Sequence, residues 1–180
     1  MTVPWEIGTR KSGKMNYEAM HNNLLIFDDC MNKFGIPHIF IFGGLLGLIR
    51  ENRLLPFDDD VEFACFSKDH RKMKYVIEEL TAQGFYIPDK NECPMHDHFF
   101  IRDKEKIEIW WFDKIGNEYV YDNGIRYHQD FFDQSTEIEF LGRQWKVPRK
   151  PKEFLKITYG ESWIIPDPKG RYILGRERYM

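Results

Sequence analysis

LPFDDDVEF, residues 55–63, contains three aspartates and one glutamate within five positions of an otherwise apolar segment. Side chains alternate between two faces in an extended strand, so Asp58, Asp60 and Glu62 share one face. The apolar Val61 then points to the opposite face. Carboxylates at this spacing repel one another unless water or a cation relieves the repulsion. The segment therefore predicts a strand with one apolar and one strongly acidic face.

Two interpretations of this acidic face are open. Hard divalent cations such as Mg²⁺ or Mn²⁺ bind through a few carboxylates together with substrate phosphates, which predicts a metal site. The alternative is the solvated face of a half-buried strand. A second alternating segment, IEIWW at 107–111, carries Glu108 between two isoleucines. Two neighbouring strands would bring Asp60, Glu62 and Glu108 together, whereas Asp59 falls on the opposite face of a regular strand and is the weakest acidic candidate.

The glycine-rich stretch before the acidic segment is the next candidate. HIFIF at 38–42 is typical of a buried strand, and GGLLG at 43–47 follows it directly. Glycine lets backbone N–H groups at a helix start approach a phosphate, which makes Gly43 and Gly44 candidates for phosphate binding. The alternative is a tight turn with close helix packing. Neither a Walker Gly-Lys-Ser/Thr sequence nor the GxGxxG spacing is present.

Four further side chains are candidates for substrate binding. Arg50 and Arg53, near the end of a short helix expected at 45–52, would balance phosphate charge. Tyr159 and Trp163 would stack on a base or a sugar. The alternatives are a solvated surface for the two arginines and the core for the two aromatic residues.

The remaining pattern predicts one domain that mixes helices and strands. A hairpin is expected where the turn RDKE separates HFFI from KIEIWWF. No repeat or linker divides the chain, so we expect a single domain over 1–180 with its core at about 15–168. Periodicity and turn residues predict helices at 15–34, 45–52, 68–83 and 152–159, and strands at 38–42, 61–65, 85–88, 98–101, 106–112, 118–122 and 137–145.

Composition narrows the class of protein. The 180 residues suffice for a core, and fifteen Phe, nine Tyr and five Trp argue against disorder. A net charge of -3 is too small for a general binder of nucleic acid, so no stable nucleic-acid partner is expected. The longest apolar run, at 39–49, is far shorter than a membrane span, and the first residues lack the apolar core of a signal peptide. We therefore expect a cytoplasmic protein.

Two other clusters of residues are weaker candidates for a functional site. Cys93, His96 and His98 are close in sequence and would suit a transition metal, but their spacing matches no common zinc pattern, so a structural role is the alternative. A basic stretch would attract an anionic substrate or lie on a solvated surface. Its members are Arg143, Lys146, Arg149, Lys150 and Lys152.

Taken in order, HIFIFGG, LLGLIR, PFDDDVEF and IEIWW resemble the LicD/fukutin family of the nucleotidyltransferase-fold superfamily. The superfamily is marked by a strand that runs into Gly-Gly or Gly-Ser, a second strand with two alternating acids, and a later third carboxylate. These features match GG at 43–44, DVEF at 60–63 and Glu108. Glu62 and Glu108 stand where Asp is usual, which keeps the charge and changes the reach of the carboxylate.

Two further segments resemble the LicD-like version of this pattern. That version adds Leu-Gly and then Arg before a Pro-aromatic-Asp-Asp-Asp block, matched by LG at 46–47, Arg50 and PFDDD at 56–60. VPRKPKEFLKITYGESWIIP at 147–166 is similar to the C-terminal element of the family. The resemblance covers most of 38–168.

The resemblance implies an α+β (α/β) fold, with a nucleotidyltransferase-like mixed β-sheet flanked by helices. It also implies a Mg²⁺- or Mn²⁺-dependent transferase that moves phosphocholine or a phospho-alditol from a CDP-linked donor to a sugar or glycan hydroxyl, releasing CMP. One alternative is a nucleotidyltransferase that moves NMP from an NTP donor. Another is a non-catalytic binding module, against which the intact carboxylate set argues. The implied catalytic and metal-binding residues are Asp58, Asp60, Glu62 and Glu108.

Overall fold

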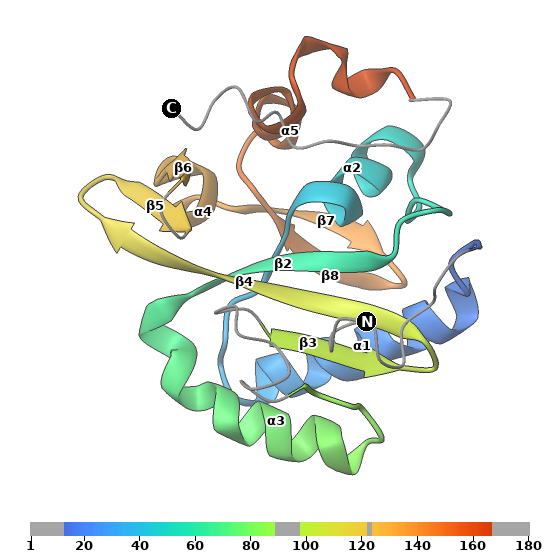
Figure 1. Ribbon diagram of the computed structural model, residues 1–180. Coiled ribbons are helices and arrows are strands. Elements are labelled where there is room, and N and C mark those ends of the chain that lie inside the picture. Colours follow the sequence, from blue (N-terminus) through green and yellow to red (C-terminus); the bar gives the residue numbers. More distant parts are fainter. Residues whose placement is uncertain (1–12, 89–97, 122–123, 167–180) are drawn as a thin grey trace, which may run out of the picture.

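A computed structural model describes residues 13–88, 98–121 and 124–166 of the chain (Figure 1). Cys93 and His96 lie outside these residues. The helices are α1 (Tyr17–Lys33), α2 (Phe42–Glu51), α3 (Met73–Ala82), α4 (Asp130–Asp133) and α5 (Pro151–Tyr159), with 3-10 helices η2 (Ser67–Lys72) and η3 (Glu161–Ile164). The strands are β1 (Ile39–Phe40), β2 (Asp60–Phe66), β3 (His98–Arg102), β4 (Glu105–Ile115), β5 (Glu118–Tyr121), β6 (Ile125–His128), β7 (Thr136–Phe140) and β8 (Arg143–Val147).

One mixed sheet organises the domain. Its strand order is β1-β2-β4-β5-β6, and β3 also pairs with β4. Strands β2 and β4 are parallel, whereas β1, β3 and β5 are antiparallel to their neighbours. The long strand β4 pairs with β2 and β3 along its first part and with β5 at its end, so it crosses the whole domain (Figure 1). The predicted α/β class and mixed sheet are confirmed.

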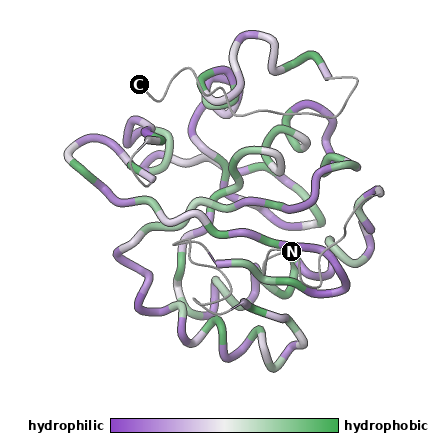
Figure 2. Tube along the Cα trace, viewed as in Figure 1, coloured by the Kyte–Doolittle hydropathy of each residue, from purple (hydrophilic) through white to green (hydrophobic). Residues whose placement is uncertain are grey.

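Helices cover both faces of this sheet. Helices α1 and α3 lie on one side, and α2 and α5 pack together on the other (Figure 1). Phe27 of α1 packs against Phe63 of β2 and Phe100 of β3, and all three side chains are fully buried. Hydrophobic residues gather in the central strands and in α2 (Figure 2). Burial of apolar side chains such as these is the dominant favourable contribution to folding.

The connection between β1 and β2 positions the acidic segment. The Ile41 N–H donates a 3.1 Å hydrogen bond to the Glu62 carbonyl oxygen, at the end of the β1–β2 pairing. Helix α2 begins at the next residue, Phe42, so its first turn lies beside the acidic end of β2. Gly43 and Gly44 therefore belong to the first turn of the helix. The expectation that they form a turn ahead of a helix at 45–52 is wrong, because the helix already begins at Phe42.

The segment expected as one strand at 137–145 is a hairpin of β7 and β8. Its turn residues Leu141 and Gly142 have φ of 53° and 70°, as a two-residue hairpin turn requires. Leucine rarely adopts positive φ, so the residue types at this position do not predict the turn. Trp145 of β8 is buried against Phe40 of β1, which attaches the hairpin to the edge of the sheet.

Other boundaries differ less. The predicted hairpin of HFFI and KIEIWWF is confirmed by the pairing of β3 with β4. Residues 85–88 form no strand, only the isolated bridge between Tyr86 and Ile101. Strand β6 and helix α4 were not predicted. Among the residues that the structure describes, no helix combines the length and the apolar character needed to cross a membrane.

Candidate functional site

Acidic side chains gather where β2 and β4 run in parallel beside the start of α2. The register places Glu62 directly opposite Glu108, with Asp60 two residues before Glu62 on the same face. Asp60 is 9% exposed and Glu108 6% exposed, so neither belongs to an open solvated surface. The structure thus brings together the three carboxylates that the alternating pattern placed on neighbouring strands.

Asp58 reaches the same group from the turn before β2. Its carboxylate lies against the backbone of Gly43, where an added Cβ would be 3.0 Å from Asp58 Cγ and 3.3 Å from Oδ1, and closer still to Oδ2. Burial raises the pKa of Asp58 to about 8, helped by the charges of Asp60 and Asp59. A glycine at position 43 is therefore what allows this carboxylate to approach the helix.

Asp59 belongs to this group as well. One carboxylate oxygen from each of Asp58, Asp59 and Asp60 lies within 4.8 Å of the other two. Strand β2 begins only at Asp60, so the alternation of an extended chain does not apply to the two residues before it. The expectation that Asp59 points away from the other acids is wrong for this reason.

The first turn of α2 also contacts the acidic group. The Gly44 N–H donates a 3.3 Å hydrogen bond to Glu62 Oε2, so this carboxylate occupies a helix N-terminus, where negative charge is favourable. Burial nevertheless raises the pKa of Glu62 well above its usual value, with further contributions from Asp60, Asp58 and Glu108. A Cβ at Gly44 would lie 3.1 Å from Phe40 and Val61, so close packing requires this glycine too.

A lysine that the sequence analysis did not select lies within the acidic group. Lys106 of β4 is opposite Asp60 in the parallel register, and its Nζ is 2.9 Å from Asp60 Oδ2. The same alternation that selects Glu108 also selects this residue, two positions earlier in the strand. That spacing was the available indication, and only the register shows that the ammonium reaches the carboxylates.

The remaining candidates divide into two groups. Arg50 and Arg53 both donate to the carboxylate of Glu51, at 2.6 Å and 2.8 Å from their Nη2 atoms. Arg53 is largely exposed, and Arg50 is largely buried. Burial, and after it the nearby charges of Glu62 and Asp58, raise the pKa of Tyr159 of α5 well above its usual value. Trp163 is half-buried in η3 and packs against the core.

His98 of the predicted transition-metal cluster and Arg143 of the basic stretch both bind other side chains of the protein. His98 Nδ1 accepts a 2.9 Å hydrogen bond from Trp111 Nε1. Arg143 Nη1 lies 2.7 Å from Asp28 Oδ2 and 2.5 Å from Asp29 Oδ1, so this member of the basic stretch ties β8 to α1.

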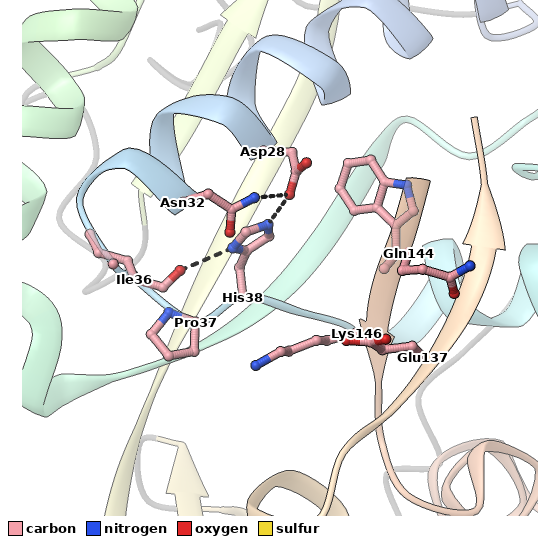
Figure 3. A pocket seen from close by; sticks show the side chains of 10 residues that line it. Asp28, Asn32, Ile36, Pro37, His38, Glu137, Gln144 and Lys146 are labelled. Atoms are coloured by element: carbon pink, nitrogen blue, oxygen red, sulfur yellow. Dashed lines mark hydrogen bonds and ion pairs between the residues drawn. The ribbon is translucent and has the colours of Figure 1, made fainter. Parts of the chain in front are cut away.

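A separate cavity of about 330 Å³ lies between the end of α1, the start of β1 and the β7–β8 hairpin (Figure 3). His38 forms part of the cavity wall, where its ring is hydrogen-bonded at both nitrogens: Nε2 lies 2.9 Å from Asp28 Oδ1, and Nδ1 lies 3.0 Å from the Ile36 carbonyl oxygen. The His38 ring also packs against Phe63, which alternates with Glu62 and so lies on the opposite face of the sheet from the acids. This cavity is therefore distinct from the acidic group.

The chemistry of the acidic group fits a hard divalent ion. Its donors are all carboxylate oxygens, which Mg²⁺ and Mn²⁺ prefer, and three of them already lie close together. Burial, and after it the charges of the neighbouring carboxylates, raise the pKa of Asp58 and of Glu62, and a bound divalent ion would favour their charged forms. The helix start beside them offers backbone N–H groups of the kind that bind phosphate.

Comparison with known proteins gives matches in sequence and in structure. The model of the LicD/FKTN/FKRP nucleotidyltransferase domain matches residues 35–150. Ribitol-5-phosphate transferase FKTN of Macaca fascicularis is 26% identical over 147 residues, and the protein of that name from Homo sapiens is 25% identical. Each alignment covers 76% of this chain and 31% of the relative, so the chain spans about a third of the length of these relatives.

Two solved structures share the fold at low sequence identity. The solution structure of the antibiotic-resistance factor ANT(2'')-Ia has a TM-score of 0.56 at 12% identity, over 89% of this chain and 80% of that one. The lincosamide antibiotic adenylyltransferase LnuA has a TM-score of 0.52 at 14% identity, over 74% of this chain and 83% of that one. The fold is therefore that of nucleotidyltransferases.

Proposed function

Because this chain belongs to the LicD/FKTN/FKRP nucleotidyltransferase-domain family, we propose that it is a Mg²⁺- or Mn²⁺-dependent transferase. In this proposal it moves a phosphate-linked group, phosphocholine or a phospho-alditol, from a CDP-linked donor to the hydroxyl of a sugar or glycan. Relatives named for the transfer of ribitol 5-phosphate support a phosphate-linked cargo.

The pairing of Glu62 with Glu108 across two parallel strands carries the proposal. It places half-buried Glu62 and buried Glu108, from different parts of the chain, on one face next to buried Asp60 and the start of α2. A structural role alone gives no reason to gather like charges in a buried location, because each one raises the free energy of the others. A bound divalent cation supplies that reason, because it neutralises the carboxylates and can also bind the phosphates of a donor.

The residues of the site have separate roles in this reaction. Asp60 and Glu62 would hold the ion, with Asp58 and Glu108 completing the oxygen donors. The bound ion would neutralise charge on the diphosphate. The Gly43 N–H at the start of α2 would orient its oxygens, whereas the Gly44 N–H holds Glu62, and phosphoryl transfer depends mainly on such positioning and charge neutralisation.

The chemical step exchanges one phosphorus–oxygen bond for another. The acceptor hydroxyl oxygen forms a bond to the phosphorus that carries the alcohol, and the bond from that phosphorus to the bridging oxygen breaks, so CMP leaves. The acceptor proton passes to a carboxylate that does not hold the ion.

Product analysis by mass spectrometry tests the proposal. The protein is incubated with Mg²⁺, a panel of glycan acceptors and one donor at a time: CDP-choline, CDP-ribitol, CDP-glycerol or a nucleoside triphosphate. CMP together with an acceptor that gains the phospho-alcohol is the expected result. Pyrophosphate together with an acceptor that gains NMP would instead establish nucleotidyl transfer, and absence of both products with every donor would contradict both reactions.

Site variants show whether the carboxylates perform the reaction. Asp60→Asn removes one charge with little change in shape and should abolish turnover while the protein remains folded. Asp113→Asn is the matched control, because Asp113 is exposed at the far part of β4 and should keep full activity. Normal turnover by Asp60→Asn would remove the metal-site proposal.

A further inference from the structure

Lys106 is a positive charge held among the carboxylates of the candidate site. Its Nζ is 2.9 Å from Asp60 Oδ2 and 4.0 Å from Glu108 Oε2. The ammonium also lies over the ring of Phe99, 5.1 Å from the ring centroid. The lysine side chain is only 12% exposed. Lys106 therefore contacts two of the four carboxylates to which the proposed function assigns the ion.

The charge on Lys106 is stable in this position. Burial alone lowers the pKa of the ammonium, but the charges of Asp60 and Glu108 and the hydrogen bond to Asp60 outweigh burial and raise the pKa overall. Buried carboxylates are costly unless they are paired, and Lys106 provides part of that pairing from within the chain. The lysine thus acts as a counter-cation for the acidic group.

A divalent ion bound to Asp60 would compete with Lys106 for the same carboxylate. An ion bound to Asp60 would lie a few ångströms from the ammonium, and two cations at that separation repel strongly in a buried environment. Binding of the ion therefore requires the ammonium to move away from Asp60 Oδ2. Lysine has a flexible four-carbon stem and is a frequent phosphate ligand, so a displaced ammonium can pair with a phosphate oxygen.

We propose that Lys106 is a displaceable counter-cation that couples the ion to the donor. It competes with the divalent ion for Asp60, and after displacement it pairs with a phosphate oxygen of the nucleotide-linked donor. This inference rests on the proposed function and deepens it, because it predicts how tightly the site binds the ion alone and how tightly it then binds the donor. The ion alone binds weakly, since it has to displace a lysine, and the donor then binds well because the lysine gains a new partner.

Calorimetric titration of Lys106→Met with Mn²⁺ and with CDP tests this coupling. Methionine keeps most of the side-chain volume and removes the charge. The variant should bind Mn²⁺ alone about tenfold more tightly than the wild type, and should bind CDP in saturating Mn²⁺ about tenfold more weakly. Lys104→Met, which removes an exposed charge from the adjacent turn, should leave both affinities unchanged. Lys106→Arg keeps the charge and should stay closer to the wild type in both titrations.

The two affinities should change in opposite directions, which distinguishes this role from general damage to the site. A folded Lys106→Met variant that binds Mn²⁺ equally well or more weakly than the wild type overturns the inference, and so does one with unchanged CDP affinity. Absence of Mn²⁺ binding in the wild type and in every variant overturns the metal centre itself, and with it the inference.

Thermal unfolding covers the case in which Lys106→Met is unstable without an ion. Removing one partner of a buried ion pair destabilises a protein, and a divalent ion would replace the missing charge. At the same Mn²⁺ concentration, the rise in Tm should be larger for the variant than for the wild type. An equal or smaller rise overturns the inference.

Discussion

Gly43→Ala should damage the site while leaving the fold intact. The added Cβ would lie 3.0 Å from Asp58 Cγ and 3.3 Å from Oδ1, and nearer to Oδ2, whereas ordinary contact begins at 3.4 Å. The carboxylate of Asp58 would therefore have to retreat by about 1 Å. A misplacement of about 1 Å in a catalytic group can reduce the rate by about 100-fold. The neighbouring atoms belong to a side chain, which can rotate, so the helix itself is not obstructed.

The effect of Gly43→Ala on stability should be small and is the internal control. Alanine is favoured over glycine in a helix by up to about 1 kcal/mol, which offsets part of the cost of moving Asp58. We expect the free energy of unfolding in urea to stay within about 1 kcal/mol of the wild type, while kcat/KM for CMP release falls about 100-fold. Wild-type kcat/KM and wild-type Mn²⁺ affinity in the folded variant would refute the placement of Asp58 against Gly43.

Three further perturbations test the structure around the site. Gly47→Ala should lower the free energy of unfolding by about 1–3 kcal/mol in urea, because its Cβ would lie 2.5 Å from the Arg53 carbonyl oxygen, and an unchanged midpoint would contradict this packing. The pKa values of Asp58 and Glu62 are raised in the folded protein, so the folded protein binds more protons than the unfolded chain. The ion-free protein should therefore lose stability as the pH rises from about 4 to about 8. Mg²⁺ should therefore raise Tm more at about pH 8 than at about pH 5.5, and an equal rise at both would count against the metal site. Arg143→Ala should lower the free energy of unfolding by about 1 kcal/mol, because it removes the ion pairs from β8 to two aspartates of α1. Hydrogen exchange should then increase in the β7–β8 hairpin, and unchanged exchange would disprove that Arg143 anchors the hairpin to α1.

The local sequence predicts the carboxylate face of the site well. Alternation within IEIWW and DVEF places Glu62, Asp60 and Glu108 on one acidic face, because strand geometry determines which side each residue faces. It could not predict the parallel register that sets Glu62 opposite Glu108 and Asp60 opposite Lys106. Register depends on contacts between distant segments, and no pattern within either strand encodes it.

Irregular backbone accounts for most of the differences between the predicted and observed structure. Asp59 joins the acidic group because it precedes the strand, which begins at Asp60. The alternation of side chains with a period of two applies only within a strand. The hairpin at Leu141 was missed because leucine is an unusual residue at positive φ. The sequence predicts Arg53 either as a phosphate ligand or as a solvated surface residue, and its largely exposed side chain pairs with Glu51 at the end of α2. Local periodicity does not determine such side-chain partners.

A crystal structure with Mn²⁺ and CDP tests the central claim most directly, because the anomalous signal of manganese locates the ion without assumptions about the reaction. We predict one anomalous peak bound by Asp60 and Glu62, with the diphosphate beside it at the start of α2 and the Lys106 ammonium moved from Asp60 to a phosphate oxygen. Manganese bound elsewhere, or CDP bound in the cavity beside His38 while the carboxylates of β2 and β4 hold no ion, would contradict the account.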